Sequence, residues 1–334
     1  MNSWHGLIDS LTPRTVVVSG DLILDRYLYT RTSRISREAP VLILAQDKEE
    51  YLLGGAGNTV RNLLSLGAEV RVVSTLGEDQ EAEILLDLLK RDGADVTGVR
   101  RVKGFSTPLK TRVMAGESNT RKQQILRLDR EAPFSKSHRG MVERTAQALE
   151  GADLLIVSDY GYSLFDPPQL RSLRRIRPLP PIFVDSRFQC RGYKGVTALT
   201  PNESEALSSA EVKGEGEKSV EIAAGRLLRS TACDCLLVTR GSRGMLLAEK
   251  GMKHRLFPIF GDTQIVDVTG AGDTVISVFS LAWAASGSFL RASLLANLAG
   301  ALSVMKMGAA VLTPRELKNG TDLYKDSLDR LAQA

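Results

Sequence analysis

The sequence predicts an α/β protein built on a doubly wound, mostly parallel β-sheet. Five short, almost continuously apolar runs lie at 15–19, 70–74, 154–158, 181–184 and 236–239. Parallel strands that are covered on both faces have this pattern. Helical periodicity follows or separates them near 58–66, 80–91, 139–149, 169–175, 220–228, 273–285 and 290–307. Such alternation of strand and helix is typical of doubly wound folds.

Two segments, 28–53 and 106–128, interrupt this alternation. Each contains a strand-like run, VLILAQ or ILRLD, among turns and arginines, and neither has a strong helical pattern. Either they pair into a small sheet that forms a lid beside the main domain, or they add strands to the main sheet. Periodicity alone does not distinguish the two arrangements. We expect one domain over 1–334, with any lid formed by these two segments.

Composition is that of a globular protein, and its mild positive charge suits a small anionic ligand as well as it suits nucleic acid. Of 334 residues, 43% are hydrophobic and 25% charged, which is ordinary for a globular protein. The net charge of +5 comes without a dense basic block, and aromatics are only 5%, so nucleic-acid binding has little support. Three cysteines give no disulfide framework, and neither a secretory signal nor a membrane-length apolar stretch is present. We therefore expect a cytoplasmic protein without nucleic-acid or membrane partners.

The most informative segment is DVTGAGD at 267–273, which precedes an apolar helix. Gly270, Ala271 and Gly272 would lie where a loop enters that helix, so unpaired backbone N–H groups and the helix dipole could hold a phosphate. Asp273 falls in the first turn, where a carboxylate repels phosphate. Its presence is explained if it takes a proton from a hydroxyl that attacks phosphorus. The alternative is that Asp273 only caps the helix. A Walker-type P-loop is absent from the sequence.

DVTGAGD resembles the C-terminal signature of the ribokinase-like (PfkB) carbohydrate kinases. Three further segments agree in the family's order: GGAGN at 54–58 with its following LG and LGED, TPNESE at 200–205, and TRGSRG at 239–244. Together they span about 12–315. The resemblance implies a ribokinase-like kinase domain with a small β-sheet lid. It also implies ATP and Mg²⁺ as cofactors and a homodimer formed through the lid.

A narrower resemblance, at 20–27, 32–41, 124–129 and 158–161, is to the kinases of this family that act on D-glycero-D-manno-heptose 7-phosphate. It implies transfer of the γ-phosphoryl group of ATP to the anomeric hydroxyl, which gives the 1,7-bisphosphate for ADP-heptose and lipopolysaccharide synthesis. Those kinases are often fused to a nucleotidyltransferase domain. This chain ends too early to contain one, so a stand-alone kinase is expected.

This chain departs from the heptose kinase pattern at two places. Tyr162 stands where lysine follows Asp-Tyr-Gly, and Asp185-Ser186-Arg187 replaces Asp-Pro-Lys. Both departures fall on the end of the site expected to hold the sugar phosphate. Two alternatives therefore stay open. One is a kinase for another sugar or a nucleoside, and the other is a catalytically silent, sugar-binding regulator on the same fold.

The resemblance also implies residue roles. Asp273 would be the catalytic base, with an anion hole formed by Gly270, Ala271 and Gly272. The sugar hydroxyls would contact Asp25, Gly54, Gly55 and Asn58, although the two glycines also suit a tight turn. Arginine is the expected partner of the sugar phosphate, and the candidates are Arg34, Arg112 and Arg187.

The remaining roles concern the nucleotide and its metal ion. Asn202 and Glu205, three residues apart, would organise water around Mg²⁺, with Glu205 reaching the ion through water. Thr239 and Gly241 would line the nucleotide site. Asn297 would lie near the adenine, unless it only satisfies a backbone group within an apolar helix.

Overall fold

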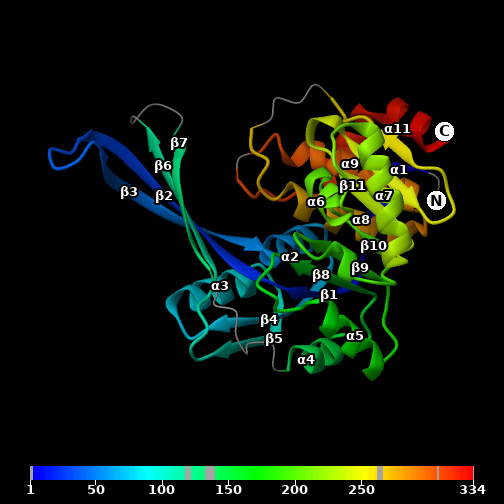
Figure 1. Cartoon of the computed structure of the whole chain (residues 1–334), viewed down its shortest axis with the longest axis horizontal. Helices are drawn as coiled ribbons and strands as arrows, with labels where there is room; N and C mark the ends of the chain where they lie inside the picture. Colours follow the sequence, from blue (N-terminus) through cyan, green and yellow to red (C-terminus); the bar gives the residue numbers. More distant parts are fainter. Residues whose placement is uncertain (1–2, 117–121, 132–139, 262–265, 307, 334) are drawn as a thin grey trace.

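The computed structural model describes residues 3–116, 122–131, 140–261, 266–306 and 308–333. Over these residues it contains a nine-stranded sheet and a separate four-stranded sheet (Figure 1). The order of the large sheet is β13-β12-β11-β10-β9-β8-β1-β4-β5. Its strands are β1 (Thr15–Gly20), β4 (Glu69–Gly77), β5 (Asp95–Val102), β8 (Leu154–Asp159), β9 (Ile182–Ser186), β10 (Ala198–Leu199), β11 (Cys235–Thr239), β12 (Met245–Glu249) and β13 (Arg255–Phe257).

The large sheet is mostly parallel, as the sequence predicts. Neighbouring strands from β11 to β5 pair in parallel, whereas β12 pairs antiparallel with both β11 and β13. The chain order reverses at β1, which has β8 on one side and β4 on the other. In open α/β sheets, ligands bind outside the carboxyl ends of the strands at such a reversal.

Helices cover both faces of the large sheet. One face carries α1 (Trp4–Asp9), α2 (Ala56–Ser65), α3 (Gln80–Arg91), α8 (Ala271–Ser286), α9 (Phe289–Ser303), α10 (Pro314–Leu323) and α11 (Lys325–Gln333). The other carries α4 (Met141–Ala148), α5 (Pro167–Ile176), α6 (Glu203–Ser209) and α7 (Glu217–Thr231). In β1, Val16 and Val18 pack into the first core and Val17 into the second. This double burial explains why the strand sequences are continuously apolar.

The two interrupting segments form a separate sheet of order β3-β2-β6-β7, hereafter the lid sheet. Its strands are β2 (Leu22–Ile35), β3 (Leu42–Gly55), β6 (Leu109–Gly116) and β7 (Gln123–Arg130). Figure 1 shows that the β2–β3 hairpin projects from the main body. The structure thus decides against extra strands of the main sheet. Residues 117–121, within the predicted segment 106–128, lie outside the described residues.

The root of the lid sheet, meaning the part around Asp25 of β2 and Lys110 of β6, lies beside the carboxyl ends of the parallel strands. β2 begins two residues after β1 ends, and the Asp21 N–H between them donates to the Ser158 carbonyl of β8. Asp25 of β2 is in register with Lys110 of β6. The chain therefore brings polar side chains of the lid sheet to the edge where β1, β8 and β9 end.

Candidate active site

Asp273 lies in the first turn of α8 and is 4% exposed. Its Oδ2 accepts a hydrogen bond from Asn58 Nδ2 at 2.8 Å, and its Oδ1 accepts from the Tyr160 hydroxyl at 2.9 Å and from Thr59 Oγ1 at 3.1 Å. These three donors come from other elements, so Asp273 is more than a cap of its own helix. Burial raises the pKa of Asp273 to about 6, against the lowering effect of the three hydrogen bonds. A carboxyl group with this pKa is largely ionised at neutral pH and still basic enough to take a proton.

The start of α8 presents small residues and no side-chain cap. Gly270 is the residue before the helix, with a φ of 78°, and no hydrogen bond from a side chain caps the end within the described chain. A β-carbon at Gly270 would collide with the Asn58 amide that holds Asp273. Glycine is therefore required at this point by both the backbone and the packing. With Ala271 and Gly272, the turn can bring backbone N–H groups close to a phosphate.

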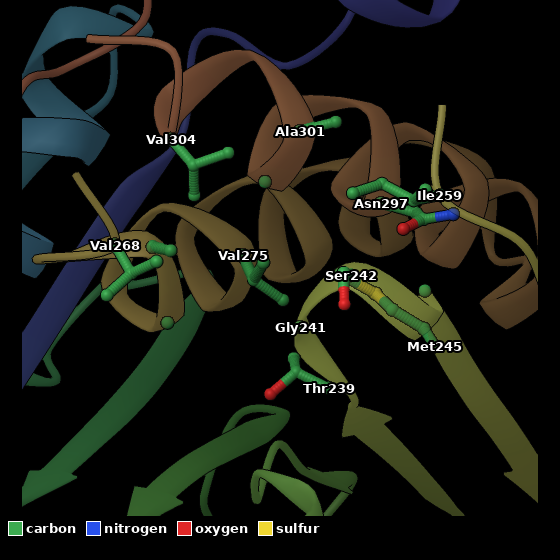
Figure 2. Close-up of a pocket in the computed structure, with 14 residues that line it drawn as sticks. Thr239, Gly241, Ser242, Met245, Ile259, Val268, Val275, Asn297, Ala301 and Val304 are labelled. Carbon is green, nitrogen blue, oxygen red and sulfur yellow. The ribbon is translucent and has the colours of Figure 1, made fainter. Parts of the chain in front are cut away.

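A cavity of ≈140 Å³ lies between α8, α9 and the turn after β11 (Figure 2). Thr239, Gly241 and Ser242 line it on one side, while Val275 and Asn297 line it from the two helices. The Asn297 amide also donates to the Pro258 carbonyl at 2.8 Å. Asn297 thus lines the cavity and satisfies a backbone group at once. A mostly apolar slot with a few polar groups suits a flat heterocycle such as adenine.

A second cavity of ≈280 Å³ adjoins the first, because Thr239 and Gly272 line both. Its other lining residues are Asp159, Tyr160, Asp185, Arg187, Thr200, Asn202 and Glu205. Burial raises the pKa of Asp185 well above its usual range, and the nearby carboxylates of Glu205, Asp273 and Asp159 add to this. The two cavities form one path from an apolar slot, past the start of α8, to an acidic wall.

Asn202 and Glu205 form a capping box at the start of α6. The Glu205 N–H donates to Asn202 Oδ1 at 2.9 Å, and the Asn202 N–H donates to Glu205 Oε2 at 2.8 Å. The three-residue spacing is thus explained first by helix capping. Both side chains still line the second cavity, and burial raises the pKa of Glu205.

Asp25 and Arg112 meet at the root of the lid sheet. Arg112 Nη1 lies 2.7 Å from Asp25 Oδ1, and the two side chains are 11% and 6% exposed. The contact is a close, buried ion pair, so the charge of Asp25 is balanced before any ligand binds. A β-carbon at Gly54 would lie 2.7 Å from Asp25 Oδ2, so this glycine lets the carboxylate lie flat against β3. Its neighbour Gly55 precedes α2 with a φ of 56°.

The three predicted phosphate-binding arginines are not brought together. Arg187 lines the second cavity, and Arg112 lies beside Asp25. Arg34 is exposed near the far end of β2, nine positions beyond Asp25, which is about 30 Å along an extended strand. For a single chain, the prediction for Arg34 therefore needs correction, because the length of the hairpin carries this residue away from the site.

Two residues at the site were not among the predicted ones. Tyr160 lines the second cavity and donates to Asp273. Lys110 is partly buried, with Nζ 5.4 Å from the centre of the Tyr160 ring, and no side-chain hydrogen bond or ion pair of Lys110 is found in the described part of the chain. Burial lowers the pKa of Lys110, and the positive charge of Arg187 lowers it further. The alternation of Lys110 and Arg112 along one strand was the available signal, because it places both on one face.

Comparison with known proteins decides the family. The model of the pfkB family of carbohydrate kinases matches residues 13–316. The chain belongs to this family. It is therefore a carbohydrate kinase, and the predicted identification with ribokinase-like kinases is confirmed.

Curated relatives include two proteins named bifunctional protein HldE. That of Citrifermentans bemidjiense is 39% identical over 321 residues, which cover 94% of this chain and 64% of the relative. That of Nitrosococcus oceani is 38% identical, with 94% of this chain and 65% of the relative covered. The chain thus spans somewhat less than two thirds of the length of these relatives.

Solved structures show the ribokinase fold. Arabidopsis thaliana ribokinase complexed with ribose and ATP superposes with a TM-score of 0.74 at 19% identity, over 92% of this chain and 99% of that one. Escherichia coli phosphofructokinase-2 in complex with fructose-6-phosphate gives a TM-score of 0.73 at 16% identity, over 94% and 100%. At these identities the likeness concerns the fold alone.

Proposed function

We propose that this kinase transfers the γ-phosphoryl group of ATP to the anomeric hydroxyl of D-glycero-D-manno-heptose 7-phosphate. The product is the 1,7-bisphosphate, a precursor for ADP-heptose and lipopolysaccharide synthesis in the cytoplasm. The observation that carries this proposal is the buried Asp273 carboxylate at the uncapped start of α8, where the apolar and the acidic cavity meet. The HldE relatives and the heptose kinase motifs support the choice of sugar.

The reaction is a direct in-line transfer without a phosphoenzyme. The oxygen of the anomeric hydroxyl bonds to the γ-phosphorus while Asp273 accepts the proton of that hydroxyl. The bond between the γ-phosphorus and the bridging oxygen breaks, and ADP leaves. Backbone N–H groups at Gly270 and Gly272 stabilise the charge on the transferred group, which is worth about 10²–10³-fold in rate. The Ala271 N–H donates to the Val268 carbonyl at 3.3 Å, so it joins them only by leaving this partner. In a loose transition state the proton leaves late, so a carboxylate of moderate basicity suffices.

The acidic wall of the second cavity fits a hydrated Mg²⁺ ion. Asp185, Asn202 and Glu205 offer the oxygen donors that this ion prefers. Within the described ranges, no group of three or more His, Cys, Asp or Glu side chains is arranged to hold a metal ion directly. Glu205 would therefore act through water, and the ion would supply charge neutralisation at the ATP phosphates.

The sugar is placed between the lid root and α2. Asp25 accepts hydrogen bonds from sugar hydroxyls, and Gly54 leaves room for the ring beside it. Asn58 holds Asp273 with its amide N–H, and its buried Oδ1, which has no partner among the described residues, accepts from the sugar.

The phosphate of the sugar lies between Lys110 and Arg187. These two cations lie close enough to lower the pKa of Lys110, and neither has an ion-pair partner in the described part of the chain. An anion bound between two cations reduces the repulsion between them. Arg112, which is already beside Asp25, adds positive charge next to this subsite.

The lid sheet is the proposed dimer interface. Its exposed apolar side chains are 46–67% exposed and comprise Ile35, Val41, Leu42, Ile125, Leu126 and Leu128. Several large apolar side chains left exposed on one small sheet favour an interaction site there. A second copy of the chain, with its own lid sheet, covers them.

No helix in the described ranges has the length and apolar character needed to cross a membrane.

A second candidate is a kinase for another sugar or a nucleoside. It is favoured by Tyr162 and Arg187, which replace lysines of the heptose kinase pattern at the phosphate end of the site. The intact DVTGAGD turn and its two adjoining cavities argue against a silent regulator.

An ADP-release assay over a panel of acceptors tests the proposal. The panel contains heptose 7-phosphate, unphosphorylated heptose, fructose 6-phosphate, ribose and adenosine, and ³¹P NMR identifies the product. We expect the highest kcat/KM for heptose 7-phosphate and a new anomeric phosphate. Preference for another acceptor would favour the second candidate, and sugar binding without ADP release would favour the regulator.

A further inference from the structure

We propose that Tyr160 is a positioning residue for phosphoryl transfer, whose hydroxyl fixes the Asp273 carboxylate in one orientation and stabilises its charged form. The inference rests on the proposed role of Asp273 as the base. It assigns a function to Tyr160 in the Asp-Tyr-Gly segment at the end of β8, a residue that was not among the predicted site residues.

The hydrogen bonds of Asp273 leave one acceptor position free. A carboxylate offers about four such positions. Asn58, Tyr160 and Thr59 occupy three of them, at 2.8, 2.9 and 3.1 Å. Three fixed donors define both the plane and the rotation of the carboxylate. The fourth position is then available for the hydroxyl of the acceptor sugar.

Tyr160 is itself held before any substrate binds. Its backbone N–H donates to Asp21 Oδ2 at 2.8 Å, so the residue is tied to the carboxyl end of β1. Lys110 Nζ lies 5.4 Å from its ring centre. A cation at this distance is attracted to the ring face and restricts its rotation. The hydroxyl therefore meets Asp273 from a preset position, rather than one that forms on binding.

The charges around Asp273 make this donor important. The charge of Asp25 of β2 disfavours the ionised form of Asp273, and an ionised Asp273 in turn disfavours that of Asp185 on β9. Asn58 and Thr59 are neutral donors. Burial and the neighbouring Asp273 raise the pKa of Tyr160 well above its usual value of 10. The phenol thus keeps its proton throughout the neutral range and always acts as a donor.

Two other roles of Tyr160 predict different effects when its hydroxyl is removed. If Tyr160 only fills space, removal of its hydroxyl changes stability but not the protonation of Asp273. If its hydroxyl stands where the acceptor hydroxyl must bind, removal lowers KM for the sugar and leaves kcat unchanged or higher. A donor that stabilises the base instead predicts a lower kcat and a shifted pH profile.

The test is the pH dependence of kcat for Tyr160→Phe, at saturating ATP and with the acceptor that the wild-type enzyme prefers. The acid limb of kcat reports the base in the substrate complex. We expect this limb to move to higher pH by about one unit. From a pKa of about 6, this shift alone lowers kcat at pH 7 by about twofold, and loss of the fixed carboxylate orientation lowers it further. KM for ATP should stay within about twofold, because Tyr160 does not line the apolar cavity.

Tyr193→Phe is the matched control. The Tyr193 hydroxyl is also buried and donates to a carboxylate, Asp159 Oδ2, at 2.9 Å, but it does not contact Asp273. We expect a loss of stability without a shift of the acid limb. Should Tyr160→Phe fold poorly, a fluorinated tyrosine at position 160 keeps the shape and is a stronger donor, so the limb should move to lower pH.

An unchanged acid limb in Tyr160→Phe with wild-type kcat would overturn the inference, as would a lower KM for the sugar with an unchanged limb. Neither result depends on which sugar is preferred. If the wild-type enzyme rejects heptose 7-phosphate but the limb still shifts with its true acceptor, the proposed substrate fails while the role of Tyr160 stands.

Discussion

The Asn58 amide donates to the Asp273 carboxylate at 2.8 Å and joins the start of α2 to the start of α8. The glycine-rich GGAGN segment and the DVTGAGD segment thus meet at one pair of side chains. Because Gly270 also lies against the Asn58 amide, both segments must keep their small residues for this contact to form.

The buried carboxylates give stability an unusual pH dependence. Burial raises the pKa of Asp273 to about 6 and, together with the charge of Asp159, that of Asp21 to about 7, whereas the ordinary pKa of an aspartate is 3.8. The folded state therefore binds more protons than the unfolded state between about pH 4 and 7. The free energy of unfolding consequently falls as pH rises through this range. We expect the unfolding free energy of Asp273→Asn, relative to that of wild type, to be about 1.4 kcal/mol higher at pH 8 than at pH 5. Urea unfolding at the two pH values measures this, and an equal difference at both would contradict it.

The Asp25–Arg112 ion pair predicts strong coupling between its two members. Removal of one partner leaves the other charge buried and unpaired, which costs about 3 kcal/mol. We expect Arg112→Met and Asp25→Asn each to destabilise the fold, and the double variant to be more stable than the sum of the single changes predicts. A double-mutant cycle by urea unfolding checks this. Additive effects would show that solvent or a ligand, rather than the pair, satisfies each charge.

Lys110 predicts discrimination between phosphorylated and unphosphorylated sugars. Lys110→Gln removes the charge that meets the sugar phosphate, so KM for heptose 7-phosphate should rise at least about 10-fold. The unphosphorylated heptose should be affected less than about twofold. Lys103→Gln, at an exposed turn before β6, is the control. An equal loss with both acceptors would place Lys110 in a structural role.

The lid sheet predicts a dimer that depends on its apolar surface. Leu126 and Leu128 are 50% and 56% exposed on β7. Replacing both by Asp should convert a dimer to a monomer in sedimentation velocity at micromolar concentration, because charge is not tolerated in a buried apolar contact. Leu323→Asp, at a side chain that is 72% exposed on α10, should leave the dimer intact. A monomeric wild-type protein would refute this interface.

Several elements could be predicted because their cause lies in the local sequence. Strands β1 and β8 are apolar at successive positions because each face of the sheet is covered, so 15–19 and 154–158 stand out. The helix predicted at 80–91 agrees with α3, since Asp79 caps it and Lys90 and Arg91 close its last turn. Short elements such as α1 and β13 left no comparable signal.

The parts that escaped prediction depend on contacts distant in sequence. Periodicity alone left the pairing of 28–53 and 106–128 open, because that pairing depends on the register between β2 and β6. The family resemblance predicted the separate lid sheet, and this prediction is confirmed. Tyr160 reaches Asp273 across 113 positions, and no local pattern reports such a bond. Arg34 was selected by its segment alone, whereas its distance from the site follows from the length of β2.

The most direct test of the account is the turnover of Asp273→Asn in the ADP-release assay with heptose 7-phosphate. Loss of the proton acceptor should lower kcat by at least about 10²-fold, with circular dichroism and KM for ATP close to wild type. Asp326→Asn on the exposed surface of α11 serves as the control and should retain full activity. Turnover within a few-fold of wild type in a folded Asp273→Asn protein would remove Asp273 as the base and with it the proposed mechanism.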